Sequence, residues 1–375
     1  MKFARITIIL VALTLFHKAF CQDELAPIPL RLPLTAVEAD SIKIKDFFWH
    51  LQMKDVEAAG MSASGQNNAK KKKKAPSEKD WQKDFETLDI ESGINGDKDN
   101  VTAIANFAQQ SGQLLRATGD SRYAKAMEHC YYNGLAGRMK ENDEGKRKAA
   151  ADALRQFTGE VMATSGKHLF INMFPRSQSH IKTSELNVET IITTSVPWFN
   201  EVFLQLLTGG KQMRMALHLK VPEWLGKEFL PNYDMGSGRK QINVFVEGEK
   251  IVPHVENGYV VIDREWDDST VVVLNFPTPT RRIHQKNKPD ETALMKGSLL
   301  YTFLNIPEGM YIKENDPVNS QFDKDRHTNV LSAPYYNKNG EKAGIYIAEP
   351  YLFNRHNPQA RIFVPTLKPG TAKQP

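Results

Sequence analysis

The stretch that decides the helical part of the fold is "TAIANFAQQSGQLLRATGDSRYAKAMEHCYYNGLAG", residues 102–137. In its first half, apolar residues such as Ile104 and Phe107 recur at the spacing of one helix face. Gly119 is the kind of residue that commonly follows the last turn of a helix, and a second helix is expected to start near Ser121. Residues 102–137 therefore predict two helices joined by a tight turn.

Cys130 lies in the second of these helices. With Tyr123, Met127 and Tyr131 it forms an apolar stripe at helical spacing. A buried free cysteine behaves as a small apolar residue, and burial raises the pKa of its thiol. A nucleophile would need a nearby base, but the adjacent His129 points to a different side of the helix. We therefore predict that Cys130 is a packing residue; a nucleophile and a metal ligand are the alternatives.

The first residues have the pattern of a targeting signal. Basic residues precede an apolar run at residues 6–16, and the small residues Ala19 and Cys21 follow it. This pattern predicts a signal peptide, residues 1–21, cleaved after Cys21. The alternative is a lipoprotein signal with Cys21 acylated, which the bulky Phe20 disfavours. Because the run is too short to span a bilayer, we expect a secreted or periplasmic protein without a transmembrane helix.

The positive charge is concentrated in short segments. The 375 residues carry a formal net charge of +5, and loss of the three basic residues of segment 1–21, which has no acidic residue, lowers it to +2. Five consecutive lysines, residues 70–74, contribute a charge of +5, which is more than this remaining net charge. Nucleic-acid-binding proteins spread basic residues over a folded face, so we expect no nucleic-acid partner. We predict a solvated lysine-rich linker, residues 66–80; a tether for an acidic surface or polymer is the alternative.

The pattern of the remaining chain changes near residue 166. Residues 22–65 predict an N-terminal strand and helix, and residues 81–165 have helical periodicity. Short alternating runs separated by Gly, Pro, Asn and Asp then predict an antiparallel β-sandwich over residues 166–290. Residues 291–375 are expected to form a C-terminal β segment and tail. The predicted fold class is multi-domain α+β, held by core burial, because a single remaining cysteine allows no intramolecular disulfide.

Several blocks of sequence carry a resemblance to a known family. In chain order they are "PLTAVEADSIKIKDFFWHLQM" (33–53), "TGDSRYAKAMEHCYYNG" (118–134), "HLFINMF" (168–174), "TSVPWFNEVFLQL" (194–206), "MALHLKVPEWL" (215–225), "NGYVVIDREWDDSTVVVLNFPTPTRRI" (257–283) and "ETALMKGSLLYTF" (291–303). The second is similar to a "TGD-x-RYAD" turn followed by "ER-x-LYNG", and the last is similar to "ALMRGPLVY". Together they resemble the β-L-arabinofuranosidase family, glycoside hydrolase family 127 (GH127).

The resemblance implies a fold, an activity and a metal. The family fold is an (α/α)6 barrel, a six-hairpin glycosidase-like fold, followed by β-sandwich domains. Its enzymes are retaining and zinc-dependent. The resemblance also implies a plant-type or other arabinose-containing polysaccharide as partner. A cysteine thiolate is the nucleophile and a glutamate the acid/base, because zinc coordination deprotonates a thiol at neutral pH. A glutamate and three cysteines, one of them the nucleophile, hold the zinc.

The chain departs from the family at these ligands. In the segment that matches the family's "E-x-C" motif, Asp99 takes the place of the glutamate and Val101 that of a cysteine. The interval that should carry the nucleophile, residues 138–167, has no cysteine, and Cys130 matches an ordinary apolar position. We therefore predict no catalytic residue, no metal ligand and no cofactor, and leave the binding residues unassigned. Residues 81–165 hold about three or four helices, which predicts a partial (α/α) barrel remnant without the closed sugar pocket.

Other polar and aromatic groups have simpler interpretations. Paired carboxylates for glycoside chemistry could come from one acidic group, which comprises Asp84, Glu86, Asp89, Glu91, Asp97 and Asp99. Without a pocket, these are expected to be loop and helix N-terminal acids. The ten histidines show no metal-ligand spacing. Trp198 and Trp224 are expected to pack in the core, although aromatic rings can also stack on sugars.

Three functions remain open from the sequence. The first is a secreted GH127-like protein with a degenerate active site, which has lost the β-L-arabinofuranosidase activity and binds carbohydrate or another surface. The second is an active glycosidase that acts on arabinose-containing glycans through a rearranged site with Asp99 and neighbouring acids. The third is a structural sandwich without a ligand. Zinc content and turnover of an aryl arabinofuranoside separate the first two, and glycan binding without turnover separates the first from the third.

Overall fold

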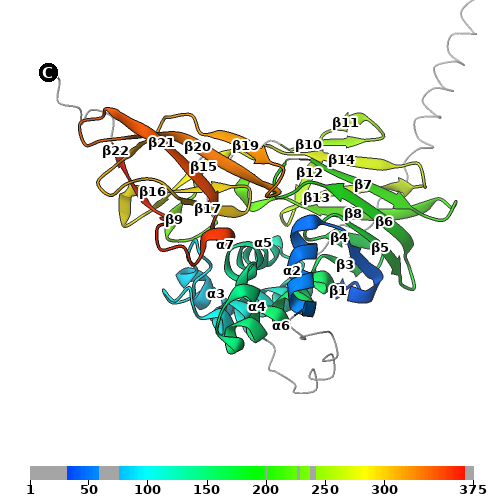
Figure 1. Ribbon diagram of the computed structural model, residues 1–375. Coiled ribbons are helices and arrows are strands. Elements are labelled where there is room, and N and C mark those ends of the chain that lie inside the picture. The colour runs from blue at the N-terminus through cyan, green and yellow to red at the C-terminus, as the bar shows by residue number, and fades with distance from the viewer. Residues whose placement is uncertain (1–31, 59–75, 200, 226–228, 237–241, 368–375) are drawn as a thin grey trace, which may run out of the picture.

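The computed structural model describes residues 32–58, 76–199, 201–225, 229–236 and 242–367. The predicted signal peptide, with Cys21, and the lysine run lie outside these residues. Within them, a layer of helices lies beneath a long row of β-sheets (Figure 1). No helix of this described part has the length and apolar character needed to cross a membrane.

The helical layer comes from the first half of the chain. Its helices are α2 (Phe47–Ala58), α3 (Glu78–Thr87), α4 (Val101–Thr118), α5 (Ser121–His129) and α6 (Glu144–Glu160), and the short α7 (Tyr351–Asn354) joins it from the C-terminal part. The two helices predicted from residues 102–137 are confirmed as α4 and α5. Gly119 ends α4 in the left-handed conformation, which glycine adopts at little cost. Asn100, Asp120 and Asp143 cap α4, α5 and α6 by accepting backbone N–H bonds, which determines where these helices begin.

Two sheets form a sandwich. The first has the strand order β1 (Thr35–Ala36), β3 (Met162–Ser165), β4 (His168–Ile171), β8 (Met213–Lys220), β13 (Tyr259–Trp266) and β12 (His254–Glu256). The second has the order β11 (Glu249–Ile251), β10 (Asn243–Val246), β14 (Val271–Asn275), β7 (Glu201–Leu207), β6 (Asn187–Thr194), β5 (Ser177–Lys182) and β2 (Ile42–Ile44). Their pairings are antiparallel except that of β4 with β8. Across the sandwich, Ser179 Oγ of β5 lies 3.3 Å from Met162 Sδ of β3.

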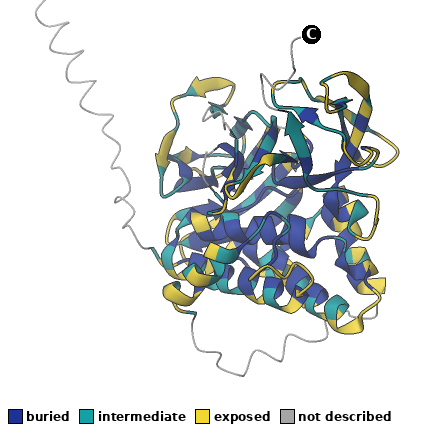
Figure 2. Ribbon diagram, turned by 90° about the vertical axis from the view of Figure 1, so that its left-hand side faces the viewer, coloured by how far each residue is buried: buried dark blue, intermediate teal, exposed yellow. Residues whose placement is uncertain are grey.

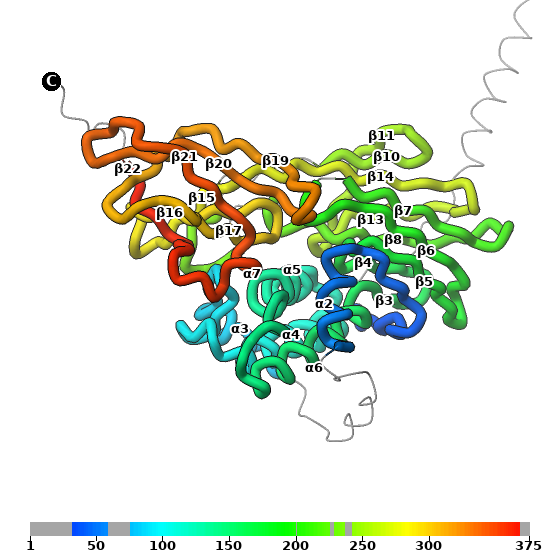
Figure 3. The backbone as a smooth tube through the Cα atoms, in the orientation of Figure 1, coloured from blue at the N-terminus to red at the C-terminus, as the bar shows by residue number. Residues whose placement is uncertain are grey.

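The N-terminal segment adds one strand to each sheet of the sandwich. β1 pairs with β3 in the first sheet, and β2 pairs with β5 in the second. In Figure 3 this segment is the blue part of the tube, which lies beside the green strands of the sandwich. Along β7, Val202, Leu204 and Leu206 are buried, whereas Phe203 between them is 42% exposed. This alternation is the period of two that predicted the strand, because successive side chains point to opposite faces.

A third sheet follows in the C-terminal part. Its order is β18 (Ile312–Lys313), β22 (Val364–Leu367), β16 (Lys288–Lys296), β17 (Leu299–Phe303), β21 (Lys342–Pro350), β20 (Thr328–Tyr336) and β19 (Asn319–Asp323), with β15 (Thr280–Gln285) on β16 and β9 (Tyr233–Asp234) on β15. The position expected to separate two domains, 290/291, falls inside β16. The β15–β16 hairpin thus carries the chain from the sandwich into the third sheet.

The helices and sheets share one buried core. Figure 2 shows buried residues concentrated between the helices and the strands, and exposed residues at the outer edges. Asn133, in the π-helical turn Cys130–Leu135 that follows α5, donates to Ser298 O at 2.8 Å and accepts from Leu300 N at 2.9 Å. These bonds attach the helical layer to the β16–β17 turn. The predicted class, helices followed by mainly antiparallel sheets with a β-sandwich, is confirmed at this level.

Candidate functional site

The two positions that match the family's zinc motif lie at the start of α4. Val101 is fully buried and offers no donor atom. The carboxylate of Asp99 is exposed, with Arg138 Nη1 3.4 Å from its Oδ1. Partial burial raises the pKa of Asp99, but the hydrogen bond and positive charge of Arg138 outweigh it and hold that pKa below its usual value. A valine beside an arginine-paired carboxylate does not fit a zinc site.

Cys130 is fully buried at the start of the π-helical turn. Burial raises the pKa of its thiol far above the usual value, so the thiolate is suppressed at neutral pH. The neighbouring His129 is engaged elsewhere: its Nε2 lies 2.9 Å from Asp89 O and its Nδ1 lies 3.2 Å from Asn133 Nδ2. Cys130 thus has no activating base at its neighbour and fills space in the core.

The acidic group considered for glycoside chemistry does not converge on a cavity. Its first two members lie on α3, and the others lie in the turns between α3 and α4. Asp89 Oδ1 accepts backbone N–H bonds from Glu91 at 2.8 Å and Gly93 at 2.7 Å, and burial raises the pKa of Asp89 to about 6. Glu91 pairs with Lys98 at 2.8 Å. These acids order the α3–α4 connection, and none of them lines either of the two hollows described below.

One pair of carboxylates does come together, in the interior. Glu128 of α5 forms an ion pair with Lys220 at the end of β8, and Glu223 of the following 3₁₀ turn lies next to them. All three residues are at most 4% exposed. Burial raises the pKa of Glu128 to about 7, the charge of Glu223 adds to this shift, and the charge of Lys220 opposes it. Because the cluster is closed to solvent, it joins α5 to the first sheet and has no access for a sugar.

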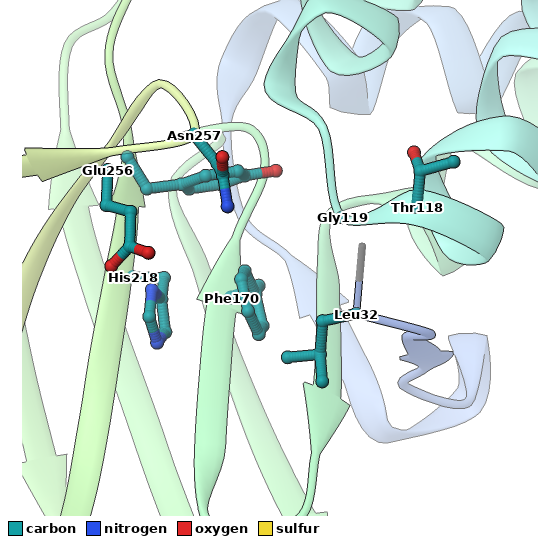
Figure 4. Close-up of a pocket in the computed structure, with 8 residues that line it drawn as sticks. Leu32, Thr118, Gly119, Phe170, His218, Glu256 and Asn257 are labelled. Carbon is teal, nitrogen blue, oxygen red and sulfur yellow. The ribbon is translucent and has the colours of Figure 1, made fainter. Parts of the chain in front are cut away.

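A small hollow separates the end of α4 from the first sheet (Figure 4). It is lined by Leu32, Thr118, Gly119, Phe170, His218, Glu256, Asn257 and Tyr259, and it has no room for a water molecule. The His218 ring stacks on Phe170 at 4.1 Å, and its Nε2 lies 3.1 Å from His168 Nδ1. Burial lowers the pKa of His218 to about 3, so this ring is neutral. The hollow is a packing seam.

The larger of these two hollows is an open groove on the third sheet. Its lining residues come from β9, the β15–β16 hairpin, the turn after β18, and β22: Asp234, His284, Gln285, Lys286, Pro289, Asp290, Glu314, Thr366 and Leu367. Its volume is about 420 Å³. Small-molecule sites typically measure about 300–1,000 Å³. We call these nine residues the β15–β22 groove.

His284 organises one wall of this groove. Its Nδ1 lies 3.1 Å from Glu291 O, and its Nε2 lies 3.2 Å from Glu314 Oε2. A neutral imidazole can donate from one nitrogen only, so the contact with Glu314 is an ion pair only when His284 is protonated. On the neighbouring strand β9, where Asp234 pairs with His284, Asp234 Oδ1 accepts the N–H of Gly236 at 3.0 Å. The wall thus presents fixed polar side chains to the groove.

The sequence did not predict the groove because four separate segments of the chain form it. Strand β15 was recognisable by alternation, but nothing in the sequence places residue 234 beside residue 284, or residue 314 beside either. Trp198 and Trp224 are buried, as predicted, and offer no platform for sugars. Among the residues that the structure describes, no three His, Cys, Asp or Glu side chains are grouped to hold a metal ion.

Comparisons with known proteins agree with the predicted resemblance. The model of the β-L-arabinofuranosidase GH127 middle domain matches residues 168–278. The comparison with curated proteins gives no match. Among solved structures, the GH127 β-arabinofuranosidase BT3674 matches with a TM-score of 0.62 at 17% identity, covering 71% of this chain and 49% of that one.

Two further solved structures share this fold. A GH127 β-L-arabinofuranosidase from Geobacillus stearothermophilus T6 matches with a TM-score of 0.57 at 17% identity, covering 71% of this chain and 49% of that one. A protein described as a glycoside hydrolase matches with a TM-score of 0.59 at 15% identity, covering 71% and 52%. The chain spans about half the length of these structures. Residues 168–278 are thus similar to the GH127 middle domain, and the chain shares the fold of GH127 β-arabinofuranosidase structures.

Proposed function

We propose that this GH127-like protein is a secreted carbohydrate-binding protein that does not hydrolyse glycans by the family's thiolate route. The observation that carries the proposal is the β15–β22 groove, with its volume of about 420 Å³. Its lining offers carboxylates, an amide, an imidazole and a hydroxyl, which are suited to hydrogen-bond sugar hydroxyls. Pro289 and Leu367 add apolar surface against which the C–H face of a sugar ring can pack.

Three observations support the absence of the family's hydrolytic route. Residues 138–167, where the nucleophile should lie, contain no cysteine. Cys130 is buried, with a raised thiol pKa. Asp99, the acid of the alternative rearranged site, is exposed and paired with Arg138. In this proposal helices α3–α6 are the partial remnant of the family's (α/α) barrel, and no cofactor takes the place of its zinc.

The proposal is tested by titrating the full mature protein with arabinan-derived oligosaccharides in a calorimeter. We expect binding by the wild type and at least about tenfold weaker binding by His284→Ala, because this change removes an imidazole that lines the groove and contacts Glu314. The matched control is His180→Ala, on the exposed face of β5, which should bind as the wild type does. Absence of binding to every oligosaccharide would favour a purely structural protein.

Turnover is tested on the same samples. With an aryl β-L-arabinofuranoside and added zinc, we expect no aryl release above the rate without protein. Release above that rate, or a glycosyl adduct on any side chain in the mass spectrum, would establish the active glycosidase and refute the loss of hydrolysis. Measured zinc content provides an independent readout, because a thiolate site of the family's kind would bring one ion per chain.

A further inference from the structure

The β15–β22 groove has an unequal balance of charges. Asp234, Asp290 and Glu314 contribute three carboxylates to its lining, and Lys286 contributes one ammonium group. His284 adds a positive charge only when it is protonated. With a neutral histidine, the lining therefore carries a formal charge of −2.

Glu314 is the carboxylate of the groove that lies against His284. Its Oε2 lies 3.2 Å from His284 Nε2, and the other nitrogen of that ring lies 3.1 Å from Glu291 O. The Glu314 side chain is nevertheless 41% exposed, whereas that of His284 is 19% exposed. Glu314 thus lies against the wall of the groove and is partly accessible to a ligand.

Two basic residues of adjoining strands, Arg282 and Lys313, are directed to other partners. Arg282 Nη2 donates to Asp316 O at 2.6 Å. Lys313 Nζ donates to Gly340 O at 3.2 Å and lies 3.8 Å from the centre of the Tyr336 ring. Neither cation belongs to the lining of the groove. An anionic ligand in the groove would therefore meet mainly negative charge.

Building on the proposed glycan binding, we infer that the groove selects neutral saccharides over uronate-bearing ones, and that Glu314 is the specificity-determining residue. A uronate carboxylate near Glu314 would lie beside a like charge at the wall of the groove. Repulsion between like charges about 4 Å apart in a water-filled groove weakens binding roughly fivefold. Salt screens this repulsion, so the selectivity should fall as ionic strength rises.

The test compares a neutral arabinotriose with trigalacturonate on the full mature protein. At low salt, we expect trigalacturonate to bind the wild type at least about fivefold more weakly than arabinotriose, with a smaller difference in 0.5 M salt. Glu314→Gln should strengthen trigalacturonate binding about fivefold and leave arabinotriose within about twofold. The matched control is Glu57→Gln, on the exposed face of α2, which makes the same change of charge outside the groove and should change neither affinity.

The outcomes separate this inference from the proposed function. Equal or tighter binding of trigalacturonate by the wild type would overturn the selectivity and leave glycan binding intact. Wild-type selectivity that Glu314→Gln does not reduce would overturn the role of Glu314. Binding of neither sugar would overturn the proposed function, and the inference with it. Unchanged thermal unfolding of the Gln variant would show that altered binding does not come from misfolding.

Discussion

Replacement of Lys220 by methionine is expected to be among the most costly single changes in this protein. Lys220 is 2% exposed and Glu128 is 3% exposed, and their ion pair joins β8 to α5. In Lys220→Met, the Glu128 carboxylate stays buried next to Glu223 and loses its counter-charge. Removing one partner of a buried pair costs about 3–5 kcal/mol of unfolding free energy. Methionine retains most of the volume, so the loss is electrostatic.

The double variant Glu128→Gln/Lys220→Met should recover much of this loss. Replacing both charges removes the unpaired carboxylate, and the amide can still donate a hydrogen bond to Glu223. We expect a coupling free energy of about 1–3 kcal/mol between the two sites. Urea unfolding followed by tryptophan fluorescence measures all four proteins of the cycle. A cost below about 1 kcal/mol for Lys220→Met, or additive single changes, would refute this account of the cluster.

The same cluster predicts a pH dependence of stability. Burial raises the pKa of Glu128 from 4.5 to about 7 in the folded protein. Because the folded-state pKa of Glu128 is raised, its contribution to the unfolding free energy is complete below its unfolded-state pKa. That contribution is lost as pH rises through about 7. Glu128 therefore favours the folded state more at pH 5 than at pH 8. The cost of Lys220→Met should shrink in acid, and Glu128→Gln should remove this part of the pH profile.

Three shorter predictions concern packing and capping. In native protein at pH 8, Cys130 should resist iodoacetamide and react only after unfolding, because burial raises its thiol pKa; rapid native alkylation would contradict its packing role. Gly258→Ala should lower the unfolding free energy by about 1–3 kcal/mol, because Gly258 has a positive φ and an added Cβ would overlap Ser121. An unchanged urea midpoint would rule out this close approach. Asp143→Ala should cost about 1 kcal/mol, because it removes the acceptor for Lys146 N at the start of α6; the control Asp152→Ala, inside the same helix, removes no cap.

Local patterns in the sequence were sufficient to predict which segments form helices or strands and in what order they follow. The period of 3.6 and the glycine at position 119 predicted α4 and α5, and the period of two predicted the strands of the sandwich. These patterns work because a helix or strand buries one face, so its hydrophobic residues repeat with the geometry of that element alone. The departure of Asp99 and Val101 from the zinc motif was equally evident, because it depends only on residue identity.

Contacts between residues far apart in the sequence became evident only from the tertiary structure. The boundary expected at 290/291 fell inside β16, because a hairpin links the sandwich to the third sheet. The β15–β22 groove joins residues from 234 to 367, and the buried pair of Glu128 and Lys220 joins residues 92 positions apart. Such contacts depend on how sheets and helices pack against one another, which local periodicity does not encode. Local sequence patterns thus predicted the elements and the identities of the residues at positions 99 and 101, and the packing of those elements created the groove and its charge.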